Sequence, residues 1–136
     1  MDVREFQLIK ELEKRIEIWK KDEKISYENF INDIEKQNAI CYNIMICIQC
    51  LIDLENIIIE KKGYEIASTY AEIFEILKRH KIIKNSLAKE LSFLARFRNV
   101  LAHVYWSIDY EKVYNVLKTK RKILEKSMKI FKGVFK

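Results

Sequence analysis

Four side chains with complementary chemistry fall within the eight residues from 98 to 105. Arg98 is a permanent cation, Asn99 an amide, His103 a titratable imidazole and Tyr105 a phenol. Imidazole is the side chain best suited to exchanging protons near neutral pH, and guanidinium binds phosphate through two parallel hydrogen bonds. The set could therefore bind a phosphate and move a proton on or off a neighbouring oxygen.

RNA cleavage needs this combination of groups. The 2′-OH must lose a proton, the 5′-oxygen must gain one, and the phosphorane accumulates negative charge. We expect His103 to transfer protons and Arg98 to hold the phosphate oxygens. Asn99 could orient the imidazole, and Tyr105 could contact the phosphate.

The spacing of Arg98 and His103 raises a geometric problem. Five residues correspond to about 140° around a regular α-helix, so the two side chains would not share a face, whereas Asn99 and His103 would be neighbours. Either the helix ends, or it widens into a π-turn, or the motif faces a second copy of itself. The other histidine, His80, is far away in sequence, so a homodimer pairing two copies of His103 would supply both an acid and a base.

Simpler explanations exist for each of these residues. An Arg and a His at this spacing often occur by chance, and aromatic residues such as Tyr105 and Trp106 more often pack in a core or anchor a loop. The segment has one His and no adjacent carboxylate pair, so we expect no metal and no cofactor.

The composition indicates the elements that must position these residues. The chain has 136 residues, of which 49% are hydrophobic, with two Gly and no Pro. A fold rich in tight turns needs Gly and Pro, so we expect helices joined by short loops. The predicted architecture is a single all-α domain over residues 1–136, an up-and-down bundle of about five helices.

Periodicity and stop signals give the approximate bounds of these helices. They are Val3 to Lys21, Tyr27 to Lys62 with a bend near residues 36–38, Ser68 or Thr69 to Arg79, a helix from Asn85–Ser86 into the motif, and one from Asp109. The second helix is apolar almost all round, which indicates the centre of the bundle, a subunit interface, or both.

The same helix contains all three cysteines, Cys41, Cys47 and Cys50. The amino terminus lacks the apolar segment of a signal peptide, so we expect a cytoplasmic protein with reduced thiols. Cys47 and Cys50 have the spacing of a metal or redox pair, but nothing completes a zinc site, and core packing explains them better. Polar residues interrupt the stretch 39–59, so we expect no transmembrane segment.

Two of those polar residues, Asp53 and Asn56, need partners if they are buried. Arg98 or Asn99 could supply them, and exposure to solvent is the alternative.

Basic residues are concentrated at the carboxyl end. Residues 112–136 carry nine Lys or Arg and one acid, a net charge of +8, whereas residues 1–111 carry 17 basic and 19 acidic residues, a net −2. Such a patch suits a polyanion, although a solvated helix face explains it as simply. The candidate RNA-binding residues are Lys118, Lys120, Arg121 and Lys122.

The string Arg98-Asn99-x3-His103-x-Tyr105-Trp106, followed by Asp109, resembles the signature of HEPN-domain proteins of the HepT type. These proteins are the toxins of HepT–MntA toxin–antitoxin pairs. The resemblance extends to the central helix at residues 39–56 and to residues 70–77, and covers roughly residues 5 to 120 in the expected order.

The resemblance implies a dimeric HEPN-like bundle in which the motifs of two protomers line a shared cleft. It implies a metal-independent endoribonuclease, with Arg98 and His103 as catalytic residues and Asn99 and Asp53 as supporting positions. Tyr105 matches the tyrosine that an MntA-type nucleotidyltransferase antitoxin modifies with AMP. The added phosphate should block RNA entry by charge and bulk. The implied partners are RNA (tRNA or mRNA), a second copy and the antitoxin, with no membrane.

Two other hypotheses remain open. The protein could be a non-catalytic subunit that binds a nucleotide or docks a nucleotidyltransferase. It could also be a plain helical interaction domain, in which Arg98 and His103 are dispensable.

Overall fold

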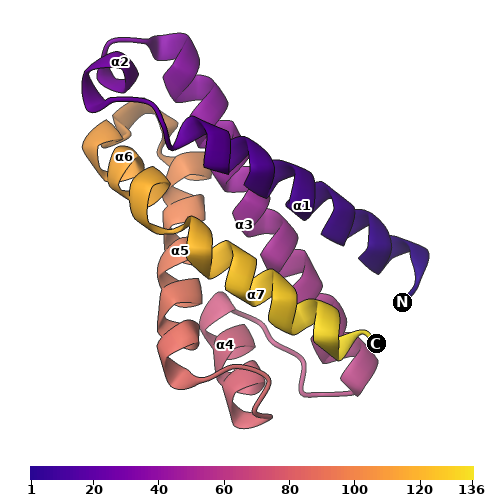
Figure 1. Cartoon of the computed structure of the whole chain (residues 1–136). Coiled ribbons are helices and arrows are strands. Elements are labelled where there is room, and N and C mark those ends of the chain that lie inside the picture. The colour runs from indigo at the N-terminus through magenta and orange to yellow at the C-terminus, as the bar shows by residue number, and fades with distance from the viewer.

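The chain folds entirely into helices, as the sequence predicts (Figure 1). The computed structural model describes residues 1–136. The elements are α1 (Val3–Asp22), α2 (Tyr27–Ile31), α3 (Ile34–Lys62), α4 (Tyr70–Arg79), α5 (Asn85–His103), the short 3₁₀ helix η1 (Tyr105–Ser107), α6 (Tyr110–Thr119) and α7 (Arg121–Val134).

Local sequence signals define most of the helix ends. A side-chain oxygen at the position before the helix accepts a backbone N–H of the first turn, which satisfies a donor that has no partner within the helix. This arrangement begins five of the helices, through Asp2, Ser26, Asp33, Thr69 and Asp109. Gly63 ends α3 in the left-handed conformation, with φ of 67°, which glycine adopts without strain.

Two of the expected helices are each divided in two, so the expected number of about five is wrong. The break between α2 and α3 falls at Asn32 and Asp33, before the expected bend at residues 36–38. Asp33 caps α3, while the Gln37 amide donates to the carbonyls of Phe30 and Ile31 at 3.1 Å and satisfies the end of α2. The chain also breaks at Lys120, which allows α6 to pack on α2 while α7 packs on α1 and α3.

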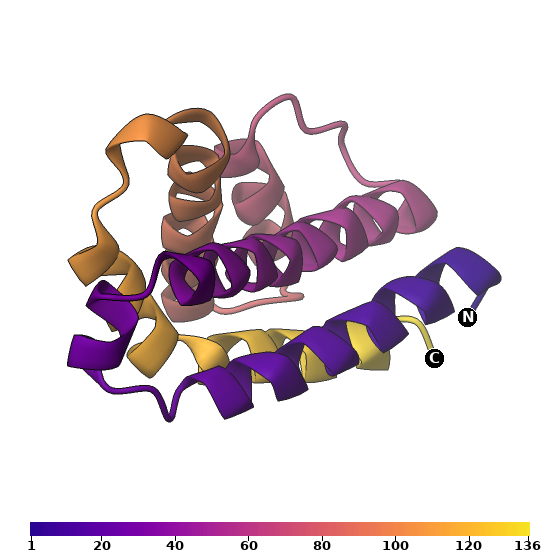
Figure 2. The ribbon, with the colours of Figure 1, turned by 90° about the horizontal axis from the view of Figure 1, so that it is seen from above.

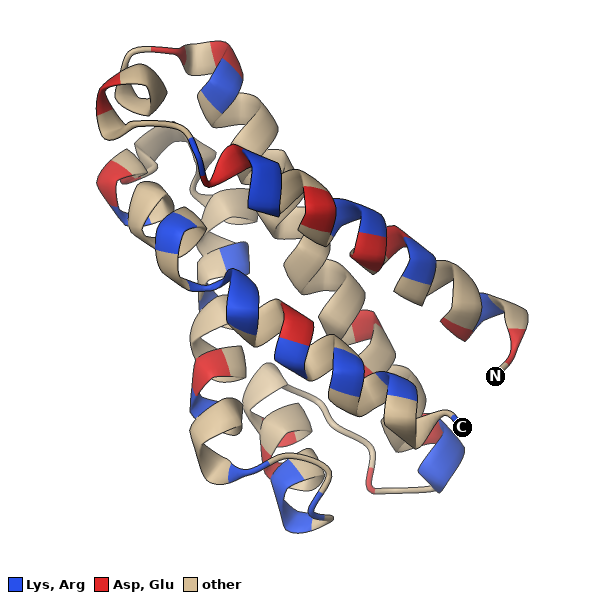
Figure 3. Cartoon of the chain, in the orientation of Figure 1, with Lys and Arg blue, Asp and Glu red and all other residues tan.

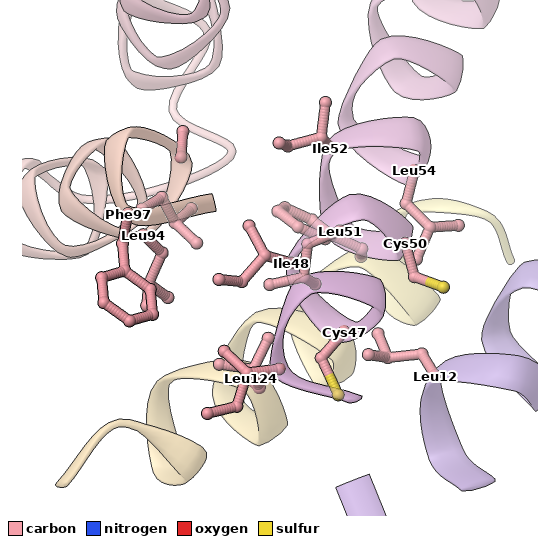
Figure 4. Close-up of a cluster of buried hydrophobic side chains, with 14 of the residues drawn as sticks. Leu12, Cys47, Ile48, Cys50, Leu51, Ile52, Leu54, Leu94, Phe97 and Leu124 are labelled. Atoms are coloured by element: carbon pink, nitrogen blue, oxygen red, sulfur yellow. The ribbon is translucent and has the colours of Figure 1, made fainter. Parts of the chain in front are cut away.

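Helix α3 is the centre of the bundle, as its apolar surface predicts. Helices α1 and α7 lie on one side of it, and α4 and α5 lie on the other (Figure 2). Leu12 of α1, Leu94 of α5 and Leu124 of α7 surround α3 in the close-up of the core (Figure 4). Burial of such side chains stabilises the fold by roughly 25 cal/mol per Å² of apolar surface removed from water.

By length and apolar composition, α3 could also cross a membrane, which differs from the expectation for residues 39–59. However, 67% of its most apolar window is buried inside the bundle. The core helix of a soluble protein has the same properties, so its composition is explained by the helices that cover it.

Trp19 links the first helix to the last third of the chain. Its side chain is fully buried, and its indole N–H donates to the carbonyl of Leu117 at 2.8 Å. A buried indole N–H without a partner would be costly, so this bond fixes α1 against α6.

Glu55 of α3 is the least expected member of the core. Its side chain is 1% exposed, and one carboxyl oxygen, Oε2, is buried without a hydrogen-bond partner. Burial raises the pKa of this carboxyl well above its usual value, and the nearby charge of Asp53 acts in the same direction. The carboxyl is therefore protonated in the folded protein under conditions where it is ionised in the unfolded chain.

Replacing Glu55 with Gln should remove a pH-dependent loss of stability. Below the unfolded-state pKa both states hold the proton, and the native state loses stability as pH rises from there through the raised folded pKa. We expect Glu55→Gln to unfold with a higher free energy than the wild type at pH 8, by about 1–3 kcal/mol, with the difference shrinking towards pH 4.

Urea denaturation followed by circular dichroism at several pH values would measure this difference. Glu60→Gln, on an exposed position of the same helix, is the control and should show no such trend. Parallel pH profiles for Glu55→Gln and the wild type would contradict the assignment.

Candidate functional site

The second half of α5 positions the residues that the sequence singles out. Leu94, Phe97 and Leu101 are buried and fix this helix against the core. The helix ends at His103, and η1 forms a short turn before half-buried Ile108 returns the chain to the core. The functional candidates therefore lie on and just beyond the carboxyl end of a helix that is packed against the core.

Arg98 is half-buried and has no carboxylate partner. Its Nη1 donates to Oδ1 of Asn99 at 3.2 Å, and its Nε is buried without a hydrogen-bond partner. Arg15, Arg79 and Arg121, in contrast, each pair with a glutamate. A partly desolvated guanidinium with free donors is suited to binding a phosphate.

His103 is exposed, and the helix remains regular up to it. The N–H of Val104 donates to the carbonyl of Val100 at 2.9 Å, which closes the final α-turn. No π-turn occurs, and the helix does not end between Arg98 and His103. The two side chains therefore leave the helix about 140° apart, and neither a helix end nor a π-turn between them brings them together within one chain.

Tyr105 and Trp106 lie on η1 and project into solvent. Tyr105 is 71% exposed and Trp106 is 73% exposed. Their rings meet edge to face, with centroids 5.4 Å apart. The simpler expectation for these aromatic residues, core packing or anchoring of a loop, is therefore wrong.

Asp53 and Asn56 do not bond to the motif. Asp53 is half-buried and accepts a hydrogen bond from Gln49, one turn earlier, at 2.9 Å. Asn56 is exposed and lines a shallow pocket beside the loop before α4. The first alternative for their partners, Arg98 or Asn99, is wrong, because those two residues bond to each other.

The four basic candidates differ in their surroundings. Lys118 donates to the carbonyl of Glu23, Lys120 pairs with Glu90 at 2.9 Å, and Arg121 pairs with Glu23 at 2.6 Å and with Glu125. Lys122 is exposed without an ion pair within the chain. Three of the four therefore already interact with partners inside the protein.

Helix α7 offers further free cations that the sequence reasoning missed. Lys126 and Lys129 follow Lys122 at spacings of four and three residues, so the three share one face of the helix. All three are exposed. Figure 3 shows basic residues recurring along α7, whereas basic and acidic residues alternate along α1. We call Lys122, Lys126 and Lys129 the α7 lysine row.

The cysteines belong to the core. Cys47 and Cys50 are buried and Cys41 is half-buried, all as free thiols. Burial raises the pKa of Cys47 to about 12 and those of Cys41 and Cys50 to about 11. Because the thiolate is the reactive form, these groups are poor nucleophiles. No three His, Cys, Asp or Glu side chains lie close enough together to hold a metal ion.

Relatives of known description share both the sequence and the fold. The family model described as ribonuclease HepT-like matches residues 5–130. A protein of Archaeoglobus fulgidus named "Putative RNase" is 26% identical over 105 residues, which cover 77% of this chain and 79% of that protein.

Two solved structures show the same fold. One is a tri-AMPylated HEPN toxin of Shewanella oneidensis in complex with an MNT antitoxin, with a TM-score of 0.86, 20% identity, and coverage of 98% of this chain and 99% of that chain. The other is the Bacillus subtilis cytosolic protein YutE, with a TM-score of 0.81, 19% identity, and coverage of 96% of this chain and 87% of that chain.

The family match spans nearly the whole chain. This chain belongs to the ribonuclease HepT-like family.

Proposed function

We propose that this protein is a metal-independent endoribonuclease and the toxin of a type VII toxin–antitoxin pair, neutralised by AMP transfer to Tyr105. The observation that carries the proposal is the combination of an unpaired arginine and two exposed side chains in the motif. Arg98 has no carboxylate partner, and His103 and Tyr105, at the end of the same helix, are exposed. Family membership and the toxin–antitoxin complex of the Shewanella relative support it.

In the proposed reaction, Arg98 binds the scissile phosphate. Its unpaired Nε and remaining Nη donors face no competing carboxylate within the chain. Such charge-assisted bonds strengthen as the phosphorane gains negative charge, so they favour the transition state over the ground state. Asn99 holds one Nη of the guanidinium and so acts as a positioning residue.

His103 supplies the proton transfers, and the proposed dimer supplies two copies of it. One imidazole removes the proton of the 2′-OH, which attacks the phosphorus, and the other protonates the departing 5′-oxygen. The products are a 2′,3′-cyclic phosphate and a free 5′-hydroxyl, with no net change in protons. The 140° separation of Arg98 and His103 within one chain supports such a shared site, because each helix alone presents the two groups on different sides.

A homodimer would also cover an open strip of the central helix. Tyr42 of α3 is 53% exposed, and Met45 and Ile46 are half-buried, whereas their neighbours Ile44, Cys47 and Ile48 are buried. Asp53 lies half-buried on the same helix, bonded to Gln49, and its proposed part is to support the site without touching the RNA.

The proposed antitoxin is an MntA-type nucleotidyltransferase. The Tyr105 hydroxyl would attack the α-phosphate of ATP, lose its proton and expel pyrophosphate. The resulting phosphodiester carries a negative charge next to the phosphate-binding motif, so it should repel RNA and block its entry. We propose that both proteins act in the cytoplasm, on tRNA or mRNA, and that the nuclease needs no cofactor.

RNA cleavage is the first test of this proposal. We expect the unmodified protein to cleave RNA in the presence of EDTA. His103→Ala and Arg98→Ala should each lower the cleavage rate by about 10²–10⁴-fold, the usual contribution of a positioned acid, base or charge stabiliser. His80→Ala is the matched control and should cleave at the wild-type rate.

A mixing experiment tests the shared site. Wild-type and His103→Ala proteins, unfolded together and refolded, should lose more activity than simple dilution explains if two protomers build one centre, because each mixed dimer holds only one of the two imidazoles. No cleavage by the wild type, with intact mass showing bare Tyr105, would instead favour a non-catalytic docking subunit. Cleavage that continues unchanged in Arg98→Ala would sink the proposed mechanism.

Tyr105→Phe should keep RNA cleavage but escape inhibition by the antitoxin. Phenylalanine keeps the ring but cannot accept AMP, so we expect this variant to cleave RNA and to remain active after incubation with the antitoxin and ATP. Intact-mass spectrometry should show AMP on the wild type and none on Tyr105→Phe. Modification of the variant at another residue, with loss of cleavage, would contradict this site.

The α7 lysine row should contribute to RNA affinity through phosphate contacts. Changing Lys122, Lys126 and Lys129 to Gln should weaken binding of single-stranded RNA. It should also lower the slope of log affinity against log salt by about 2, since each phosphate contact on a single strand contributes roughly 0.7.

Fluorescence anisotropy with catalytically inactive His103→Ala protein would measure both quantities. Lys62, Lys84 and Lys89, which are also exposed and unpaired, give the matched control when changed to Gln. Equal slopes for the two triple variants would show that the row does not bind RNA.

A further inference from the structure

The 3₁₀ turn after the motif leaves a large aromatic side chain in solvent for which the proposed mechanism has no role. Trp106 is 73% exposed, whereas the other tryptophan, Trp19, is fully buried. Tryptophan is usually one of the most buried side chains, so an indole held in water is a costly arrangement. Ile108 returns to the core two residues later, so the exposure arises locally in the turn.

The surroundings of Trp106 suit a small flat ligand. The ring of Tyr105 meets it edge to face, at an interplanar angle of 87°. This contact limits the orientations of both rings, and an indole that is mostly in solvent keeps a free face. The nearby side chains of His103, Ser107 and Asp109 are exposed and polar.

The size of the aromatic patch favours a base over a protein partner. Two aromatic side chains offer at most about 150–250 Å² each, whereas a specific protein interface buries roughly 800 Å² on each partner. In α5, Val100 is the one other large apolar side chain that is exposed. The two rings alone therefore offer less area than a specific protein interface needs.

We propose that Trp106, supported by its edge-to-face contact with Tyr105, stacks on an unpaired nucleobase of the RNA whose phosphate Arg98 binds. The inference rests on the proposed function and specifies its substrate class. A base can reach an exposed indole only when it is not paired within a helix, so the substrate is single-stranded or looped RNA. Stacking tolerates any base, so Trp106 selects unpaired structure rather than sequence.

The two tryptophans make the test direct. In His103→Ala protein, which should bind RNA without cutting it, Trp106 is the tryptophan that solvent and ligand can reach. A single-stranded RNA oligonucleotide should quench its emission as binding saturates, and a blunt duplex of the same sequence should not. The Trp106→Leu form of this protein reports the emission of Trp19 alone and should not change on titration.

Affinity gives a second readout. Trp106→Leu should weaken single-stranded binding by about 5- to 150-fold, which corresponds to the usual stacking contribution of one base. Trp106→Phe should restore most of the affinity, because it keeps a ring. Ile66→Ala is the control, because Ile66 is 92% exposed but lies in the loop before α4, and it should bind as the parent does.

Each outcome separates the inference from the proposed function. RNA that binds and is cleaved without quenching, and with equal affinity for Trp106→Leu, overturns the stacking inference and leaves the ribonuclease intact. Quenching without cleavage by the otherwise wild-type protein supports the stacking and counts against the ribonuclease. Equal quenching by duplex RNA, no RNA binding by anisotropy, or a blue shift of Trp106 on protein self-association alone overturns the stacking.

Discussion

The burial of α3 is the constraint on which the rest of the structure depends. This helix is apolar almost all round, and its 29 residues must be covered from several sides. Helices α1, α5 and α7 supply most of that cover. Each of them packs one face on α3 and further surface on other neighbours, so only the residues left over face solvent. His103 and Tyr105 are among these exposed residues, and Arg98 is half-buried.

Helix α5 combines packing and chemistry through its period of 3.6 residues. Leu94 and Leu101 are directed into the core, and Arg98, at i+4 from the first and i−3 from the second, is half-buried on the same side of the helix. His103 lies on the opposite, exposed side. The same regularity keeps Arg98 and His103 on different sides of the helix, so the packing that stabilises the helix also prevents one chain from completing the proposed centre. The proposed mechanism therefore depends on a second subunit for its chemistry.

Some basic side chains of this protein hold helices together through ion pairs, and others have no ion-pair partner. Arg121 and Lys120 hold α7 to neighbouring helices through glutamates, and burial of apolar side chains stabilises the same contacts. Arg98 has no glutamate partner, although its Nε is buried. An unsatisfied buried donor costs about 1–3 kcal/mol in a folded protein, and such costs are most readily explained where a ligand satisfies them.

The sequence alone determined the all-α class and the position of most helix ends, because capping side chains and apolar periodicity act over a few residues. It also identified the family through the motif on α5. Only the tertiary structure decided that α2 and α3 separate at Asp33, and that α7 turns away from α6 at Lys120. Packing against distant helices divides those segments, and no residue type near Lys120 indicates the break between α6 and α7.

The partners of individual polar groups were likewise decided by tertiary structure. Lys118, Arg121 and Lys122 are all basic residues of the same stretch of sequence. Only the first two contact Glu23, which lies 95 residues from Lys118 and 98 residues from Arg121. Trp19 and Trp106 are the same residue type, and one is fully buried while the other lies in solvent. Residue type determines which chemistry is available, but the distant segments that pack around each side chain determine which groups remain free to use it.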